Sequence, residues 1–598
     1  MSRRDHRRSK SVSSSSSSST EEVFIDIKRR VYKKQDSDSS SSSEIECYSN
    51  DKSKKKKQHK SKKDSCSSES DEKCKKKKDC KSDSDSEKCT FEEVYKYYKY
   101  RLLTDDKLMA GGSTAYTFAY DNENEIIPRN FQDEFENIAI SYNIDLPYAG
   151  APQYVRESGV YILFFIIASE EAAQFAVFVN GEGQQLTRIG NNSGAGQLVL
   201  RTMLRLNKDD AVVIRNSESS SMAVESNTYL GGLQPGNTCS FLMMKIAPYD
   251  VCDHCDWDDN CLSKKKKHLF KKLLDKMLCD KELMLKGFNV HGTFYSKNAQ
   301  SVLTEDDIVW DSLQNVNGLL WDPVNPKQVK VLEDGVYKLF ALATTVTPTQ
   351  ISLTVNGVPI EYTTQGTNKG AGQVTLRTLL PLNKNDIVTV RNHTSANGKI
   401  DLGEFSGGTQ KSVSAIITIF KIAPLCKPQL VDNCKLNKYY KKTYNLFREY
   451  LLNNKCLQVE GSSSLFSLVS DSHQKITNGV SVDWTTNQLL RNVHHTQGKP
   501  EIVIEQDGIY DIFFDILTNE PSQLTLFING VADLSTTFGR ESGGARCLMR
   551  QFIKLNKCDV LTVRNYESHS TTLTTSINAG GQLVGQSALF MAFRLSAE

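Results

Sequence analysis

The chain has 598 residues, enough for three or four domains, and 74 Lys and Arg nearly balance 71 Asp and Glu to leave a net charge of +3. No stretch approaches the roughly 18 consecutive apolar residues of a membrane span, and no apolar signal-peptide core follows the basic N-terminus MSRRDHRRSK. The composition therefore excludes a membrane-spanning class and predicts a soluble protein made in a cytosol.

Residues 1–88 differ in composition from the rest of the chain. They contain runs of serine and lysine and few apolar residues, so they cannot bury enough surface to offset the entropy of ordering. They hold 25 Lys and Arg against 17 Asp and Glu, a net charge of +8, which leaves −5 for the remaining residues. We expect a disordered basic tail, which either contacts nucleic acid or an anionic surface or is simply a solvated tether.

The rest of the chain contains one unit three times, at residues 111–250, 287–425 and 461–598, here called copies 1, 2 and 3. Shared markers recur 176 residues apart and then a further 173 residues apart. In copy 1 these markers are Gly159, Asn180-Gly181, Leu206-Asn207-Lys208, Arg215-Asn216, Gly231-Gly232 and Lys245. A period this long indicates one folded domain used three times rather than a solenoid of small repeats.

A helical pattern precedes each copy, within residues 89–110, 251–286 and 426–460. Apolar residues recur every three to four positions in all three segments, and a glycine follows each as a stop signal at Gly111, Gly287 and Gly461. The apolar side of an amphipathic helix must be covered, so we expect these helices to lie on a sandwich or on one another.

Within each copy the pattern changes to short β-strands. In copy 2, alternating Ile351, Leu353 and Val355 lead into Asn356-Gly357, a pair that accepts the positive φ angles of a type I′ hairpin turn. The three predicted hairpin turns are Asn180-Gly181, Asn356-Gly357 and Asn529-Gly530.

Residues 374–382 alternate between apolar side chains on one face and Thr375, Arg377 and Leu379 on the other. This pattern predicts a half-buried antiparallel strand. Many short strands with turn signals between them predict a mainly β fold of three tandem jelly-roll sandwiches, each preceded by a short amphipathic helix.

The strand and turn motifs resemble those of known families. The Gly-x-Tyr strand start, the Asn-containing hairpin and the apolar closing strand resemble the jelly roll of complement-q globular heads and the tumour necrosis factor superfamily. The GAGQ, LNK-x-D, VRN and GGTQ pieces are more similar to tip domains of bacterial spore-surface (exosporium) filaments and to domains of large DNA virus proteins. The resemblance implies a fold, about 90 residues in each copy, and usual assembly as trimers. The collagen-like stalk common in those relatives is missing from this chain.

Polar residues also recur in all three copies. The repeated Asn and Asp residues, such as Asn356 and Asp386, are interpreted as turn and loop residues. The arginines on the second face of the predicted strand are candidates for an interface salt bridge. These are Arg201, Arg377 and Arg550.

Cysteines are concentrated in the tail and the connectors, with pairs before each helix. The pairs are Cys80 and Cys89, Cys252 and Cys261, and Cys426 and Cys434. Disulfides or cross-links between connectors are one hypothesis, and reduced thiols are the other, because cytosolic proteins seldom keep disulfides. Zinc is disfavoured, because the CDHC sequence at 252–255 has no counterpart in the other copies.

No catalytic signature is present. The sequence has no phosphate-binding loop, no His-Glu-x-x-His and no Gly-x-Ser-x-Gly, and no histidine recurs at an equivalent place in the copies. We therefore predict no enzyme activity, cofactor or metal site. The hypothesis is a structural protein of a particle, first a large DNA virus virion and otherwise a spore coat or exosporium. The alternative is a carbohydrate- or receptor-binding module.

The expected partners are other particle proteins and the protein itself. Each connector with its helix is long enough to carry the chain from one sandwich to a neighbour, because a helix of about 22 residues covers roughly 33 Å. We predict an intramolecular pseudo-trimer with the helices at one end. The alternatives are separate domains joined like beads and a trimer of three chains.

Overall fold

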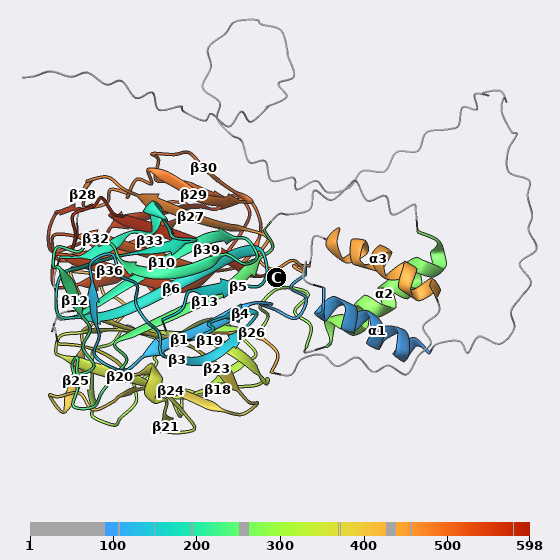
Figure 1. The fold of residues 1–598 in the computed structure, drawn as a ribbon, viewed down its shortest axis with the longest axis horizontal. Coiled ribbons are helices and arrows are strands. Elements are labelled where there is room, and N and C mark those ends of the chain that lie inside the picture. The colour runs from blue at the N-terminus through green and yellow to red at the C-terminus, as the bar shows by residue number, and fades with distance from the viewer. Residues whose placement is uncertain are drawn as a thin grey trace, which may run out of the picture. The chain divides into compact units, whose positions relative to one another are not determined.

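A computed structural model describes residues 90–597, apart from 106–107, 149, 193, 195, 250–261, 281, 369, 371, 426–437, 455–456 and 578. The predicted tail, residues 1–88, and the six paired cysteines lie outside the described residues. The described part consists of three antiparallel β-sandwiches, each preceded by one helix (Figure 1). The predicted fold class is confirmed for this part of the chain.

The three helices are of similar length. They are α1 (Phe91–Leu103), α2 (Lys264–Leu278) and α3 (Lys438–Leu452). Thr90 caps α1 with a reciprocal capping box, in which its hydroxyl accepts from the Glu93 backbone and the Glu93 carboxylate accepts from the Thr90 backbone.

The strands of copy 1 run from β1 to β13. They are β1 (Tyr116–Asp121), β2 (Ile126–Pro128), β3 (Asn137–Tyr142), β4 (Ile144–Asp145), β5 (Gln153–Val155), β6 (Gly159–Ser169), β7 (Ala173–Val179), β8 (Glu182–Gly183), β9 (Ile189–Asn191), β10 (Gly196–Leu206), β11 (Ala211–Asn216), β12 (Ala223–Glu225) and β13 (Cys239–Ala247). One sheet has the order β10-β6-β13-β1-β3, and the other has the order β4-β5-β11-β7-β8. In this jelly-roll arrangement the chain crosses repeatedly from one sheet to the other.

Copies 2 and 3 repeat this arrangement. The strands of copy 2 are β14 (His291–Ser296), β15 (Gln300–Leu303), β16 (Ser312–Asn317), β17 (Leu319–Trp321), β18 (Val329–Val331), β19 (Gly335–Thr345), β20 (Thr349–Val355), β21 (Val358–Pro359), β22 (Gln365–Thr367), β23 (Gly372–Leu382), β24 (Ile387–Asn392), β25 (Lys399–Leu402) and β26 (Ala415–Ala423). Those of copy 3 are β27 (Leu465–Ser470), β28 (Lys475–Thr477), β29 (Thr486–Arg491), β30 (Val493–His495), β31 (Ile502–Ile504), β32 (Gly508–Thr518), β33 (Ser522–Ile528), β34 (Val531–Ala532), β35 (Phe538–Arg540), β36 (Ala545–Leu555), β37 (Val560–Asn565), β38 (Thr572–Thr574) and β39 (Ala588–Ser596).

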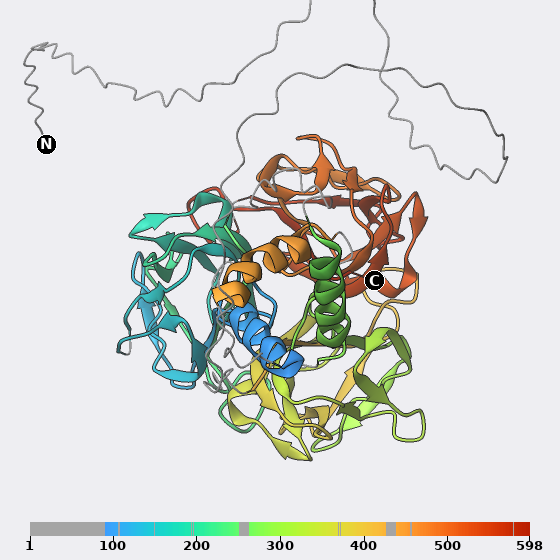
Figure 2. The same cartoon turned by 90° about the vertical axis from the view of Figure 1, so that its right-hand side faces the viewer.

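The three sandwiches surround a common axis (Figure 2), with copy 1 in blue to teal, copy 2 in green to yellow and copy 3 in orange to red. One apolar cluster contains buried residues of all three copies, including Phe164, Phe340 and Phe513. Copies 1 and 2 each keep a further core between their own two sheets. The sandwiches therefore share an interior in addition to their separate cores.

This shared interior changes one sequence-based expectation. Strand β23 was predicted to be half-buried, but all of its residues except Pro381 are buried. Leu376 and Leu380 face the core of copy 2, whereas Leu379 belongs to the cluster shared with the other copies. The other face of β23 holds the polar residues Thr375 and Arg377. This face contacts another copy rather than water.

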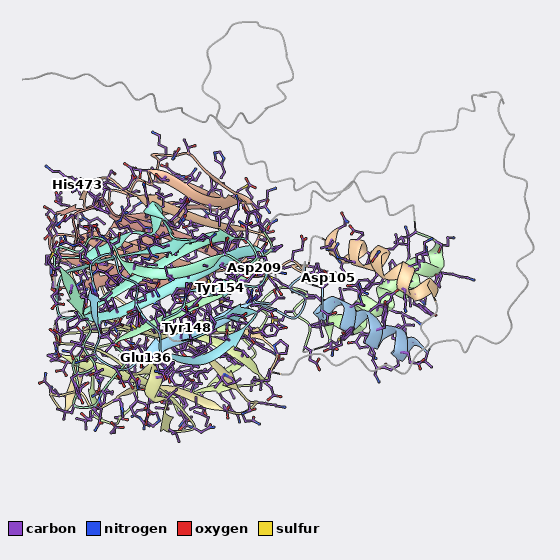
Figure 3. All side chains as sticks on the ribbon, viewed as in Figure 1. Asp105, Glu136, Tyr148, Tyr154, Asp209 and His473 are labelled. Atoms are coloured by element: carbon purple, nitrogen blue, oxygen red, sulfur yellow. The ribbon has the colours of Figure 1, made fainter. Side chains whose placement is uncertain are left out.

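The helices pack on one another through Tyr98, Phe270 and Phe447. The Phe447 ring centre lies 5.3 Å from that of Tyr98 and 5.2 Å from that of Phe270. Ion pairs between helical segments add to this packing, with Asp105 (Figure 3) accepting from Arg448 at 3.0 Å. The helices thus cover each other's apolar sides.

Hydrogen bonds close a ring where the helices lead into the sandwiches. Backbone N–H groups at the entry of each copy donate to the last strand of another copy. The pairs are Ser113 to Ile422, Phe288 to Leu595, and Ser462 to Ile246. Copy 1 therefore contacts copy 2, copy 2 contacts copy 3, and copy 3 contacts copy 1.

Candidate assembly interface

A glycine-pair loop precedes the last strand of each copy and lies against the next sandwich; we call these loops the latches. They contain Gly231-Gly232, Gly407-Gly408 and Gly580-Gly581. Isolated antiparallel bridges join Gly232 to Ser395, Gly408 to Ser568, and Gly581 to Ser219. Since copy 3 reaches back to copy 1, the latches form a second closed ring of contacts.

Glycine is required in the latches for two physical reasons. Gly407 has a φ of +67°, a conformation that L side chains rarely adopt, and an added Cβ would lie 2.1 Å from the backbone oxygen of Ser522 in copy 3. Gly231 and Gly580 have φ of +74° and +66° and the same 2.1 Å approach to Thr349 and Ala173. Only a residue without a side chain allows the two backbones to come this close.

A buried glutamine in the receiving sandwich binds each latch. The Nε2 of Gln350 donates to the backbone oxygen of Gln234 at 2.9 Å, and that of Gln523 donates to Gln410 at 2.8 Å. In copy 1 the Nε2 of Gln174 donates to Leu583 at 2.9 Å. All three glutamines are fully buried, so their side-chain amides are shielded from water.

These glutamines were not singled out from the sequence, although a signal was present. A polar residue follows the first residue of an apolar strand at the same place in all three copies, in AQFAVFV, TQISLTV and SQLTLFI. A repeated buried amide needs a partner of its own. In this protein the partner comes from the next copy.

The GAGQ segments make a second set of contacts between copies. The side chain of Gln197 accepts from the Thr375 N–H at 2.8 Å and donates to the Thr375 backbone oxygen at 3.0 Å. Gln373 binds the Leu548 backbone in the same two-point manner, at 2.8 and 3.2 Å. In both cases the side-chain amide accepts one hydrogen bond from the backbone of the neighbouring sheet and donates one to it, as an adjacent strand would.

Copy 3 departs from this pattern, because its segment reads GGAR. Arg546 donates to Gly190 of copy 1 at 3.4 Å and forms an ion pair with Asp515 of its own copy at 3.1 Å. The third junction therefore uses a charged pair where the other two use an amide.

The three predicted interface arginines all lie in the shared interior. Arg201, Arg377 and Arg550 come from β10, β23 and β36 and are at most 2% exposed. Each guanidinium approaches a phenylalanine of another copy. The carbon Cζ of Arg201 lies 3.7 Å from the Phe513 ring centre, that of Arg377 lies 5.0 Å from Phe164, and that of Arg550 lies 5.1 Å from Phe340.

The arginines differ in their charged partners. Arg550 donates two hydrogen bonds to Asp511 of its own copy, at 2.8 and 2.5 Å. Burial acts to raise the pKa of Asp511, but the adjacent Arg550 outweighs it and holds this pKa below its ordinary value. Arg201 and Arg377 have no carboxylate partner among the described residues. The ion pair of Arg550 therefore lies within copy 3, and among the described residues Arg201 and Arg377 form no interface salt bridge.

The predicted hairpin residues lie away from this interior, at exposed ends of strands. Asn180, Asn356 and Asn529 have φ near +53°, and the following glycines have φ above +80°. Each asparagine side chain donates to the repeated aspartate of a neighbouring turn at 2.8 Å. The pairs are Asn180 with Asp210, Asn356 with Asp386, and Asn529 with Asp559.

Other candidate chemistry is sparse in the described part of the chain. Of the cysteines that the structure describes, Cys239 and Cys547 are buried. Among the described residues, no group of three His, Cys, Asp or Glu side chains is arranged to hold a metal ion. No helix there is long and apolar enough to cross a membrane.

No family model matches this sequence, and no curated protein matches it. Solved structures that match include the globular domain of zebrafish complement 1qA, at 13% identity and a TM-score of 0.19, over 23% of this chain and 99% of that chain. Pika GITRL matches at 14% identity and a TM-score of 0.15, over 23% and 98%. A conserved protein of unknown function from Pseudomonas aeruginosa matches at 7% identity and a TM-score of 0.15, over 50% and 99%.

Proposed function

We propose that this protein is a non-enzymatic structural component of a particle, in which three jelly rolls of one chain form a single assembled block. The observation that carries the proposal is the doubly closed ring of contacts between copies, at the latches and at the entry segments. The buried residues at these contacts join the copies to one another. Such a block presents three related outer surfaces from one polypeptide.

The virion of a large DNA virus is the particle we propose first, with a spore coat or exosporium as the alternative. The GAGQ, LNK-x-D, VRN and GGTQ motifs support this choice by their resemblance to domains of such particles. The basic tail, residues 1–88, is proposed as the tether to nucleic acid or to an anionic surface of the particle.

Mass measurement and particle proteomics test this proposal together. Light scattering of the full chain should give a single-chain mass of 67.1 kDa, with a compact small-angle scattering profile. Proteomics of purified particles from the source should recover the protein at structural abundance. A mass of three chains contradicts the intramolecular block, and absence from purified particles contradicts the particle role.

The tail has its own test. If it contacts nucleic acid, retention of the full chain on DNA should fall steeply between about 50 and 200 mM salt, as counterion release requires. A chain lacking residues 1–88 should lose this retention and keep its β-sheet circular dichroism. Retention that does not change with salt contradicts a nucleic-acid tether.

A ligand-binding role is the second candidate, because copy 1 exposes aromatic side chains. Phe131 and Tyr148 are 63% and 69% exposed, and Tyr148 and Glu136 lie on the sandwich of copy 1 (Figure 3). Aromatic rings beside polar loops suit carbohydrate and protein ligands. Binding on a glycan array that is lost in Tyr148→Ser but kept in Val324→Ser, the equivalent position in copy 2, would support this role.

A further inference from the structure

The shared interior contains more positive than negative side chains. Five buried cationic groups and two buried carboxylates gather around the arginine positions. They are Arg201, Arg377, Arg546, Arg550 and Lys338 with Asp511 and Asp515. Asp511 pairs with Arg550 and Asp515 pairs with Arg546. Among the described residues, no carboxylate pairs with the other three cationic side chains, Arg201, Arg377 and Lys338.

Within the part of the chain that the structure describes, these three side chains have polar atoms with no hydrogen-bond partner. They are the Nε and Nη1 of Arg201, all three guanidinium nitrogens of Arg377, and the Nζ of Lys338. The exposed fractions of the side chains are 2%, 2% and 0%, so bulk water does not reach them. Buried polar groups are almost always paired, and buried charges are paired or bind ions.

The three groups converge on one aromatic ring. The Cζ of Arg201 and the Nζ of Lys338 each lie 4.1 Å from the ring centre of Phe164, and the Cζ of Arg377 lies 5.0 Å from it. A ring attracts a cation at its face, but it has only two faces and cannot accept hydrogen bonds as an anion does. Three like charges around one ring repel each other in an interior of low dielectric constant.

Loss of protons relieves this repulsion only in part. Burial lowers the pKa of Lys338 well below its ordinary value, so the amine can be neutral. Burial also lowers the pKa of Arg201 and Arg377, but a guanidinium starts above 12 and keeps its proton in proteins. Two positive charges therefore need compensation even when Lys338 is neutral.

We propose that a small inorganic anion of the halide class binds between Arg201, Arg377 and Lys338, and that it becomes enclosed when the three copies assemble. The planar guanidinium donors and the ammonium provide the hydrogen bonds that such an anion accepts. Asp511 and Asp515 lie in the same interior, which favours a single negative charge over a multiply charged oxyanion.

Crystallography with bromide tests the site directly in the full chain. Crystals soaked in sodium bromide should show one anomalous difference peak in contact with the guanidinium groups of Arg201 and Arg377. No peak at this position would overturn the proposal. This measurement needs no variant, so it does not depend on whether a substituted chain folds.

Thermal unfolding tests the same site in solution. The chloride concentration is raised by substituting chloride for gluconate in the buffer at constant ionic strength. Gluconate is the reference anion because it is too large for the interior. The melting temperature of the unsubstituted chain, the parent of the variants below, should rise with the logarithm of chloride concentration, as for any ligand that binds only the folded state. Arg377→Met, and Lys338→Met as a second variant, should lose most of this rise. Lys384→Met, at an exposed position in the same copy, should keep it.

The opposite pattern is equally informative. If Arg377→Met and the parent gain the same number of degrees from chloride, the dependence comes from general salt effects and the proposed site is wrong. If Arg377→Met is more stable than the parent by the same amount at low and high chloride, the arginine is an uncompensated charge, and the proposal is also wrong.

Discussion

The hairpin and the latch of copy 2 are both repeated glycine-containing turns, yet they differ in what surrounds them. Gly357 in the hairpin and Gly407 in the latch have φ of +82° and +67°. A Cβ at Gly357 would meet nothing within 4 Å, whereas one at Gly407 would lie 2.1 Å from the Ser522 oxygen of copy 3. A glycine with positive φ therefore forms a local turn in the hairpin, whereas in the latch it joins two copies.

The largest effect is expected from Gly407→Ala. Positive φ costs about 1–3 kcal/mol for a residue with a side chain, and overpacking against a backbone oxygen adds about 1–3 kcal/mol. We expect a loss of about 2–6 kcal/mol in the free energy of unfolding, measured by denaturant titration of the full chain. Scattering should also show a larger radius, because copies 2 and 3 separate at this latch.

Gly398→Ala is the matched control for this substitution. Gly398 lies in the same copy and has a φ of +71°, but an added Cβ there meets nothing within 4 Å. It should show only the backbone cost, about 1 kcal/mol, and no change in radius. Equal losses for Gly398→Ala and Gly407→Ala would contradict the role assigned to the latch.

Gln523→Ala should have the next largest effect. It removes a buried side chain that donates to Ser406 and Gln410 and accepts from the Gln410 N–H. Leaving these backbone groups unpaired should cost about 3 kcal/mol in the free energy of unfolding. Gln497→Ala, at an exposed position of the same copy, should change stability by less than about 0.5 kcal/mol. A small loss for Gln523→Ala would show that the latch does not depend on this amide.

Gly357→Val tests the other side of the comparison. A β-branched residue at positive φ should lower the free energy of unfolding by about 1–3 kcal/mol. The radius of the chain should stay the same, because a Cβ at Gly357 meets nothing within 4 Å. An unchanged melting temperature would be incompatible with the turn assignment.

Asp386→Ala should give the smallest effect. Its carboxylate accepts from the Asn356 side chain at 2.8 Å at an exposed position, and it also accepts from the Asn383 N–H at 2.7 Å. Loss of solvent-exposed hydrogen bonds should cost about 0.5–1.5 kcal/mol. A loss larger than that of Gln523→Ala would mean that the hairpins, rather than the latches, dominate stability.

Much of the local structure could be predicted from the sequence because it depends on neighbours along the chain. The alternation in residues 351–355 and the Asn356-Gly357 pair predicted a strand and a hairpin that lie where expected. The exposure of β23 could not be predicted. An alternating strand looks the same whether its polar face meets water or another sheet, and here Thr375 and Arg377 meet the other copies.

Only some of the interface residues could be predicted from the sequence. Arg201, Arg377 and Arg550 were singled out because a charged residue recurs within an apolar strand. Gln174 and its equivalents were missed, since the signal of their burial appears only when the apolar strands of the three copies are compared with one another. The glycine pairs were recognised in the sequence as markers of the repeat. Glycine is required there because an added Cβ would collide with backbone atoms more than 100 residues away in the chain.

The sequence by itself determined the three copies, their strands and turns and their helices, because periodicity and turn chemistry act over a few residues. Only the tertiary structure decided which sandwich each latch contacts, that the helices cover one another, and which cations meet at the Phe164 ring. Those outcomes depend on surfaces brought together from distant parts of the chain. The physical reason is burial: a polar group excluded from water needs a partner, and folding alone determines which group is near enough to be one.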